Sequence, residues 1–288
     1  MKDQRSELTN HQTSAEDQAL SDKFANNQQP IRRSYEDEVD FEVSNYPTAT
    51  ISRKDTVAKL HDLMKEFPLV QIRATPASGK STLLRLLRAY CRSNESDFDV
   101  VSLMVGWPDE TPGDFYEWLK AFAKRIGYGV TLKDFEATRP NSKKIAILLD
   151  EGQTSYHDLQ LWHSFIKTAL ETRKHIRIVM ASCYGSNSDG DYNENHRGLL
   201  TQVSIGDERI VQLYASGPKP GVFFTQKEFA ELEKKFAEGT NLQLSGSFRR
   251  SFFNITGGHC GAVFGLLQHI FSSSVSFIPS ERSGMLIF

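Results

Sequence analysis

The hydrophobic positions of the chain fall into short apolar runs separated by amphipathic stretches. The apolar runs have the length of strands and lie at 69–74, 100–105, 145–149, 176–182 and, more weakly, 208–214. The stretches between them carry apolar residues at helical spacing and lie at 53–67, 83–90 and 114–126. Strands that alternate with helices predict a right-handed parallel sheet with helices on both faces. We therefore expect an α/β three-layer sandwich around a five-stranded, mostly parallel sheet.

The pattern changes after Thr225. Thr225 and Glu228 have the spacing of a capping box, which marks the start of a helix. A glycine-rich turn at 256–261 precedes another apolar helix, and no strand is predicted in this part. We expect a core at 46–218, a small helical lid domain at 219–275, and a tail at 276–288 that shows no clear pattern.

The first 45 residues are polar and contain few large apolar side chains, so a disordered or loosely attached segment is predicted. It contains the acidic cluster Tyr35-Glu36-Asp37-Glu38. A solvated run of charges is the favoured interpretation of this cluster, and a docking segment is the alternative.

Composition excludes several classes of protein. A net charge of −2 in 288 residues gives no electrostatic case for nucleic acid or acidic membranes as partners. No apolar run approaches the ~18 residues of a membrane span, and Met1 to Asn10 lacks the apolar segment of a secretory signal. Cys91, Cys183 and Cys260 are far apart and form no CxxC pair, which favours reduced thiols. We expect a soluble cytoplasmic chain.

A phosphate-loop pattern follows the first strand. Residues 74–81 read ATPASGKS, which is G-x-x-x-x-G-K-[ST] with Ala74 at the first glycine position. Such a loop directs backbone N–H groups at phosphate oxygens, and the predicted nucleotide-contacting residues are Pro76, Ala77, Ser78, Gly79, Lys80, Ser81 and Thr82. Pro76 has no N–H and shapes the loop. Lys80 is expected to reach the β- and γ-phosphates, and Ser81 to bind Mg²⁺. The alternative is an ordinary helix start capped by Ser78.

Two carboxylates follow the most apolar strand. Asp150 and Glu151 end a run of five apolar residues, at the edge of a parallel sheet where ligands bind. Asp150 is the predicted metal ligand, and Glu151 is predicted to orient or deprotonate the attacking water. Lys80, Asp150 and Glu151 are thus the catalytic candidates. A cap on the helix near Tyr156 is the alternative.

The intervening strand and the glutamate favour the glutamate-using ATPases over small-molecule kinases and Ras-like GTPases, and no N/TKxD base-reading motif is found. Ser182, at the end of a further strand, is either a sensor of the γ-phosphate or a simple strand-end hydroxyl. A loop at 185–198, rich in Ser, Asn, Asp and Gly, is predicted to be mobile. The arginine-finger candidates, which the sequence does not rank, are Arg173, Arg177, Arg197, Arg249 and Arg250.

From about Thr48 to Phe271 the chain resembles the AAA+-related STAND class of P-loop ATPases, and within it the ATPase module of Crinkler-type effector proteins of fungi and oomycetes. The resemblance is carried by Ile51-Ser52-Arg53, ATPASGKS, the LLDE strand end and TGGHCGAVFGLL. It implies a lid helix that faces the nucleotide, with Gly258, His259 and Gly261 as lid residues. His259 is then a candidate phosphate contact, or else a helix-start residue that bonds to local backbone. A secreted or host-cell destination follows from the resemblance alone.

The chain departs from this family at Ala74 and at Cys260, where many STAND lids place a proline against adenine. The family's N-terminal LFLAK-type header and downstream nuclease or kinase domain are absent from the sequence given, so we expect a stand-alone module or an incomplete relative. We predict an ATP- and Mg²⁺-dependent, slowly hydrolysing switch with a protein partner or self-association. The alternative is a weakly binding P-loop scaffold. A DNA-dependent motor would need a basic groove, for which Arg32-Arg33 and Arg249-Arg250 are too sparse.

Overall fold

The computed structural model describes residues 34–43, 50–93, 97–110, 112–127, 129–136, 143–172, 174–183, 205–240, 242–275 and 286–287. Its helices are α2 (Tyr35–Val43), α3 (Lys54–Glu66), α4 (Lys80–Arg92), α5 (Phe115–Ile126), α6 (Leu132–Glu136), α7 (Lys167–Glu171), α8 (Gln226–Thr240), α9 (Gly246–Thr256) and α10 (Cys260–Val275). Its short segments are the 3-10 turns η1 (Gly152–Ser155) and η4 (Asp207–Arg209) and the π-helical η2 (Gln160–Ile166). Its strands are β1 (Leu69–Ala74), β2 (Val100–Val105), β3 (Ile145–Asp150), β4 (Ile176–Cys183), β5 (Ile210–Val211), β6 (Leu242–Gln243) and β7 (Leu286–Ile287).

Five of these strands form one parallel sheet in the order β2-β3-β4-β1-β5. β1 pairs with β4 from Leu69 opposite Ile178 to Ala74 opposite Cys183. Because all pairs are parallel, the carboxyl ends of β1, β4 and β3 lie at one edge of the sheet. β4 separates β1 from β3, which places these two strands about 10 Å apart. The prediction of a five-stranded α/β fold is confirmed.

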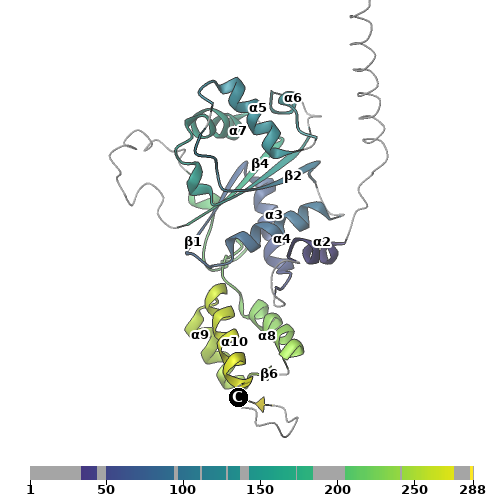
Figure 1. Ribbon diagram of the computed structural model, residues 1–288, viewed down its shortest axis with the longest axis vertical. Coiled ribbons are helices and arrows are strands. Elements are labelled where there is room, and N and C mark those ends of the chain that lie inside the picture. Colours follow the sequence, from purple (N-terminus) through teal and green to yellow (C-terminus); the bar gives the residue numbers. More distant parts are fainter. Residues whose placement is uncertain are drawn as a thin grey trace, which may run out of the picture. The chain divides into compact units, whose positions relative to one another are not determined.

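Helices cover both faces of the sheet (Figure 1). The core of one face joins α2, α3 and α4 to the strands and includes Val57, Leu60, Val70, Ile72, Leu84 and Leu87. The core of the other face joins α5, α6 and η2 to the strands and includes Trp118, Phe122, Phe135, Ile147, Phe165 and Met180. β3 contributes to both cores and is buried along its whole length, as its continuous apolar run predicts.

The region predicted to be the lid, and called the lid below, contains α8, α9 and α10 around a core of its own, which includes Phe229, Phe252 and Val263 (Figure 1). Ile51, from the segment before α3, belongs to this core. The predicted capping box is present, since Thr225 N donates to Glu228 Oε2 at 2.8 Å and Glu228 N donates to Thr225 Oγ1 at 3.2 Å.

Three expectations about the elements were wrong. Residues 35–43, expected to be disordered, form α2, because Tyr35 and Val39 are buried in the core shared with α4. The strand expected at 208–214 is reduced to β5, because residues 207–209 form a 3-10 turn. The region after Thr225 contains a short parallel pair, β6 with β7, where no strand was expected.

Other expectations lie outside the described residues, namely those for residues 1–33 and for the loop at 185–198. The division of the chain at 46, 219 and 276 stays a prediction. In the part of the chain that the structure describes, no helix has the length and apolar character needed to cross a membrane.

Candidate functional site

The loop between β1 and α4 adopts a strained conformation. Gly79 has a φ of 91°, which glycine adopts at little cost, and Ala77 has a φ of 56°, which a residue with a Cβ rarely adopts. Ala74 ends β1 with no positive φ, so the altered first glycine of the pattern sits in ordinary strand backbone. The loop turns directly into α4 at Lys80, with Gly79 as the residue before the first helical turn.

Lys80 folds its side chain back along this loop. Its Nζ donates to Thr75 O at 2.8 Å and to Ala74 O at 3.2 Å, and the side chain is buried. The ammonium is therefore held at the end of β1, where ligands of parallel sheets bind. Ser78 is 1% exposed, and its Oγ has no hydrogen-bond partner among the described residues. An orphaned hydroxyl buried in the loop fits a bound group that supplies the missing partner.

The carboxylates lie where the sheet order predicts. Asp150 ends β3 and is buried, and its Oδ1 accepts a hydrogen bond from Glu151 N at 3.0 Å. Glu151 has a φ of 54°, so the chain turns sharply at this residue into η1. Lys80 and Asp150 thus lie at the same edge of the sheet, on strands separated by β4. They do not lie on opposite sides of the molecule.

The donor set fits Mg²⁺ held largely by a bound triphosphate. Among the described residues, no group of three or more His, Cys, Asp or Glu side chains could hold a metal ion. Mg²⁺ commonly takes one or two protein oxygens and completes its shell with phosphates and water. Ser81 and Asp150 could supply those two oxygens, so a self-contained protein cage is not required.

Two glutamines that the sequence analysis missed organise the end of β4. Gln71 on β1 donates through Nε2 to Ser182 Oγ at 3.1 Å and to Tyr156 Oη at 3.3 Å. Gln153 in η1 contacts the Glu151 carboxylate and Cys183 N. Ser182 is 1% exposed, so its hydroxyl lies in the interior of the sheet rather than on the loop surface. The sensor role of Ser182 stays a prediction.

The start of α10 packs directly on the phosphate loop. Gly261 N donates to Ala77 O at 2.8 Å, and His259 Nε2 lies 3.0 Å from Thr75 Oγ1. A Cβ added at Gly79 would meet Cys260 Sγ at 3.0 Å. The structure therefore brings His259 and Gly261 to the loop, as the resemblance implies. The side chain of His259 contacts a threonine of the loop, and a phosphate-contacting role for it stays a prediction.

A cavity of about 220 Å³ lies between the loop, the lid and the segment that precedes α3. Its lining is mostly apolar and comprises Thr50, Ile51, Arg53, Ala77, Gly79, Thr82, Phe224, Leu232, Cys260, Gly261 and Phe264. An apolar pocket with a few polar groups at its border suits a planar ring system. Cys260, at the position where the resemblance expects proline, is one of its walls, and burial raises the pKa of its thiol to about 11.

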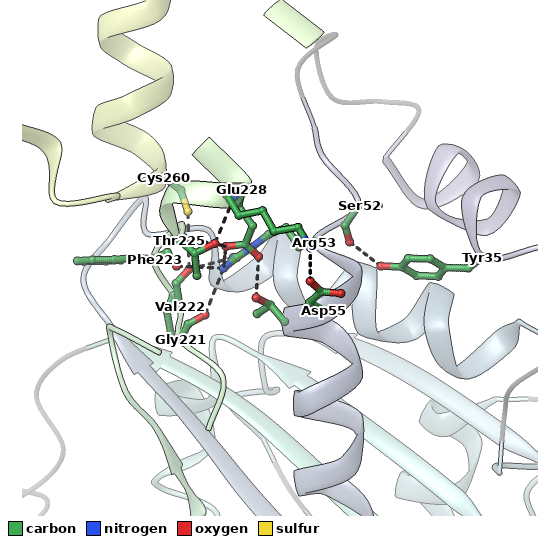
Figure 2. Close-up of polar contacts among 12 residues, drawn as sticks. Tyr35, Ser52, Arg53, Asp55, Gly221, Val222, Phe223, Thr225, Glu228 and Cys260 are labelled. Carbon is green, nitrogen blue, oxygen red and sulfur yellow. Dashed lines mark hydrogen bonds and ion pairs between the residues drawn. The ribbon is translucent and has the colours of Figure 1, made fainter. Parts of the chain in front are cut away.

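Arg53 joins the core to the lid beside this cavity (Figure 2). It has a φ of 49° and is 4% exposed, and its guanidinium donates to Glu228 and to the carbonyl oxygens of residues 221–223. Glu228 also accepts from Thr56 Oγ1 at 2.6 Å. Sequence reasoning named Arg53 only as part of a motif. The only signal in the sequence was an arginine at the start of one predicted helix and a capping-box glutamate at the start of another.

The three arginine-finger candidates that the structure describes, Arg177, Arg249 and Arg250, are not brought to the site. Arg177 lies near the start of β4, at the opposite end of that strand, where it donates to Lys65 O and Lys174 O. Arg249 pairs with Glu233 inside the lid, and Arg250 is exposed on α9. Arg173 and Arg197 lie outside the described residues.

The three cysteines are free, as expected. Cys91 is a residue of α4 and is buried in the core, whereas Cys260 lies at the loop and Cys183 at the end of β4. The strand order, the loop and the acidic strand end together give the chain a P-loop NTPase-like fold.

Comparisons with known proteins return structures and no sequence relatives. No family model matches the chain, and no curated protein matches it. The chain is similar to the Walker-type ATPase PABY2304 of Pyrococcus abyssi, at 14% identity and a TM-score of 0.43, over 78% of this chain and 70% of that one. It is similar to the RuvB Holliday junction branch migration motor of Thermotoga maritima, at 12% identity and a TM-score of 0.36, over 78% and 62%.

The origin recognition complex of Drosophila bound to DNA is a further likeness, at 11% identity and a TM-score of 0.42, over 87% of this chain and 63% of that one. The chain thus spans less than two thirds of the matched RuvB and origin recognition chains.

Proposed function

We propose that the chain is a Mg²⁺-dependent, ATP-binding switch module that hydrolyses ATP slowly, similar to the STAND class and to the ATPase module of Crinkler-type effectors. The observation that carries the proposal is the shared sheet edge. Lys80 follows β1 and Asp150-Glu151 follow β3, with β4 between them. This arrangement has the positive charge, the metal ligand and the base that phosphoryl transfer to water requires.

Each residue has a distinct role in this proposal. Lys80 would exchange its two carbonyl partners for phosphate oxygens, which accept stronger, charge-assisted hydrogen bonds. Ser81 and Asp150 would hold Mg²⁺, which neutralises phosphate charge when bound. Glu151 would accept a proton from the attacking water. The adenine ring would occupy the apolar cavity beside Cys260.

The contacts between α10 and the loop support the switch. Gly261 N bonds to Ala77 O, and His259 contacts Thr75, so the loop cannot change its conformation without affecting the start of α10. A ligand that binds the two conformations unequally shifts their populations and moves the lid. A protein partner, or a second copy of the chain, would bind the two positions of the lid with different affinity.

The Lys80 contacts also favour a second candidate function. Its ammonium already donates to two backbone carbonyls, Lys80 as a whole is 6% exposed, and Cys260 packs against Gly79. A loop closed in this way is what a P-loop scaffold that binds nucleotide weakly would have. In that case the fold serves protein interaction and not hydrolysis.

The deciding experiment compares the wild type with Glu151→Gln for Mg·ATP binding and turnover, with GTP and with EDTA as further arms. The proposal expects tight binding by both proteins and a turnover that falls by about 10²- to 10⁴-fold in Glu151→Gln. Glu66→Gln, an exposed glutamate at the end of α3, is the control and should change neither. Undetectable binding by all three proteins would leave the scaffold as the function. A nucleotide-dependent change in molecular mass would support switching.

A further inference from the structure

Gln153 lies in η1, two residues after Glu151, and holds the carboxylate of that residue. Its amide nitrogen donates to Glu151 Oε2, and its amide oxygen accepts from the backbone N–H of Cys183 at 3.2 Å. Cys183 is the last residue of β4. One side chain therefore connects the proposed base to the end of the neighbouring strand.

The chemistry of the two partners fixes which way round the amide lies. A backbone N–H can only donate, and an ionised carboxylate can only accept. The amide oxygen must therefore face Cys183, and the amide nitrogen must face Glu151. Among the side chains of this size, glutamine is the one that offers a neutral donor and an acceptor at the same end. A glutamate at this position would place a second carboxylate against Glu151.

The backbone around Gln153 is held tightly, so its side chain starts from a defined position. A Cβ added at Gly152 would meet Met180 Cγ at 2.2 Å, which shows that η1 is pressed against β4. Thr154 donates to Glu151 O through its N–H at 2.9 Å and through its Oγ1 at 2.8 Å. These bonds hold the left-handed backbone of Glu151, a conformation that costs about 1–2 kcal/mol for a residue with a Cβ.

The position of β4 connects the contact between Gln153 and Cys183 with the proposed reaction. β4 lies between β3, which precedes Glu151, and β1, which precedes the phosphate loop. By bonding to Cys183, Gln153 draws the Glu151 carboxylate toward the strand beside the loop. We propose that Gln153 is a positioning residue that fixes the Glu151 carboxylate at the end of β4 for proton transfer from water. This inference rests on the proposed ATPase function.

The test uses Gln153→Met, which keeps the shape of the side chain and removes both hydrogen bonds. Misplacement of a catalytic group by about 1 Å can cost about 10² in rate, so we expect kcat to fall by about 10- to 100-fold. KM and the Kd for Mg·ATP should stay within about twofold, because Gln153 touches the base and not the phosphate loop. Gln153→Glu keeps the acceptor for Cys183 and should lose more kcat than Gln153→Met.

The control and the double variant separate positioning from general damage. Gln160→Ala removes a half-buried glutamine that donates to Gly113 O and accepts from Ser164 Oγ, away from Glu151, and should leave kcat unchanged. In the Glu151→Gln background, Gln153→Met should cause no further loss, since Gln153 acts through Glu151. Thermal melting identifies any variant that fails to fold. If Gln153→Met does not fold, the kcat of Gln153→Glu is compared with that of the wild type instead.

The outcomes distinguish the inference from the function on which it rests. An active wild type with undiminished kcat in Gln153→Met overturns the positioning role alone. The positioning role is also overturned if Gln153→Met weakens Mg·ATP binding as much as it lowers kcat. It is overturned as well if Gln153→Met lowers kcat further in the Glu151→Gln background. A wild type that binds Mg·ATP but turns over no faster than Glu151→Gln overturns the ATPase proposal, and with it this inference.

Discussion

Arg53 Nε lies 3.0 Å from Glu228 Oε1, and both side chains are almost fully buried. Arg53 is the last residue before α3 of the core, and Glu228 lies in the first turn of α8 in the lid. A buried ion pair is stable only when further hydrogen bonds satisfy both ions. Here three backbone carbonyls and Thr56 provide them, so the pair and its surroundings form a single polar joint between core and lid.

We predict that Glu228→Gln lowers the free energy of unfolding by about 3 kcal/mol, because it leaves the buried Arg53 guanidinium without its counter-ion. Urea unfolding measures the effect. The matched control is the pair Lys227–Asp55, which joins the same two helices at the surface. Asp55→Asn should leave the free energy of unfolding unchanged, since exposed pairs contribute little. If both substitutions lowered the free energy of unfolding equally, the buried pair would contribute no more to stability than the exposed pair does.

The same joint predicts an acid dependence of stability. Burial alone would raise the pKa of Glu228, but the charge of Arg53 and the hydrogen bonds from Arg53 and Thr56 outweigh it and hold that pKa below its usual 4.5. A depressed pKa in the folded state contributes stability above the unfolded pKa, and that contribution is lost as the pH falls. The free energy of unfolding of the wild type should therefore decrease as the pH falls below about 4.5. Glu228→Gln should show a shallower dependence over this range.

A second prediction concerns the contact between α10 and the phosphate loop. Gly261→Ala would place a Cβ 2.7 Å from Ala77 O and 2.8 Å from Ala77 Cβ, so the start of α10 must move away from the loop. Gly265, one turn further along the same helix, has no atom within 4 Å of such a Cβ. Gly265→Ala is therefore the matched control.

Hydrogen exchange with and without Mg·ATP measures this coupling. The wild type and Gly265→Ala should show protection of α10 that depends on nucleotide, and Gly265→Ala should gain about 0.5–1 kcal/mol of stability from the better helix former. Gly261→Ala should lose the nucleotide dependence at α10. If nucleotide changes the protection of α10 equally in both variants, the contact between Gly261 and Ala77 does not transmit the nucleotide state of the loop to the lid.

A third prediction concerns Gly79. Gly79→Ala combines a φ of 91°, unfavourable for alanine by about 1–2 kcal/mol, with a Cβ that meets Cys260 Sγ at 3.0 Å. We expect lower stability and a loss of Mg·ATP affinity, as followed by calorimetry. Gly113→Ala, at a site with open space and no positive φ, is the control. The additional substitution Cys260→Ala should not restore affinity, because it relieves the contact and leaves the backbone strain.

A fourth prediction follows from the thiol of Cys260. Burial, with a further contribution from Glu228, raises its pKa to about 11. Alkylation of Cys260 in the folded protein should therefore be much slower at pH 8 than alkylation of a free thiol, and should accelerate toward pH 11. Because the unfolded thiol ionises near pH 9, its contribution to stability is complete below pH 9 and declines above it. Peptide mass spectrometry after timed labelling checks the rate, and fast labelling at pH 7.5 would contradict it.

The sequence was sufficient for the four longer strands of the sheet because each is rich in apolar residues, and β3 is continuously apolar as far as Leu149. β1 and β2 have the predicted bounds, and β3 and β4 each end one residue after the predicted run, at Asp150 and Cys183. The loop could be placed because its residues are adjacent in sequence. Ala77 lies in that loop, but its left-handed backbone was not foreseen, since nothing local distinguishes it from an ordinary alanine.

The residues that sequence reasoning missed act across long sequence separations. Arg53 and Glu228 are far apart along the chain, as are Gln71 and Ser182. Gln153 is near Glu151 in sequence, yet its role depends on the N–H of Cys183 on another strand. A single sequence shows no such pairings. The helix α2 was missed for a related reason, because its acidic composition hides the fact that Glu42 meets Arg88 and Arg92 of α4.

The strand order has a consequence for biosynthesis. β1, which leads into the phosphate loop, has both of its hydrogen-bonded neighbours, β4 and β5, more than a hundred residues later in the chain. A nascent polypeptide leaving the ribosome therefore holds the lysine-bearing turn without its flanking strands until most of the chain has been translated. Under the proposed function, capture of a triphosphate waits until β4 and β5 have been made.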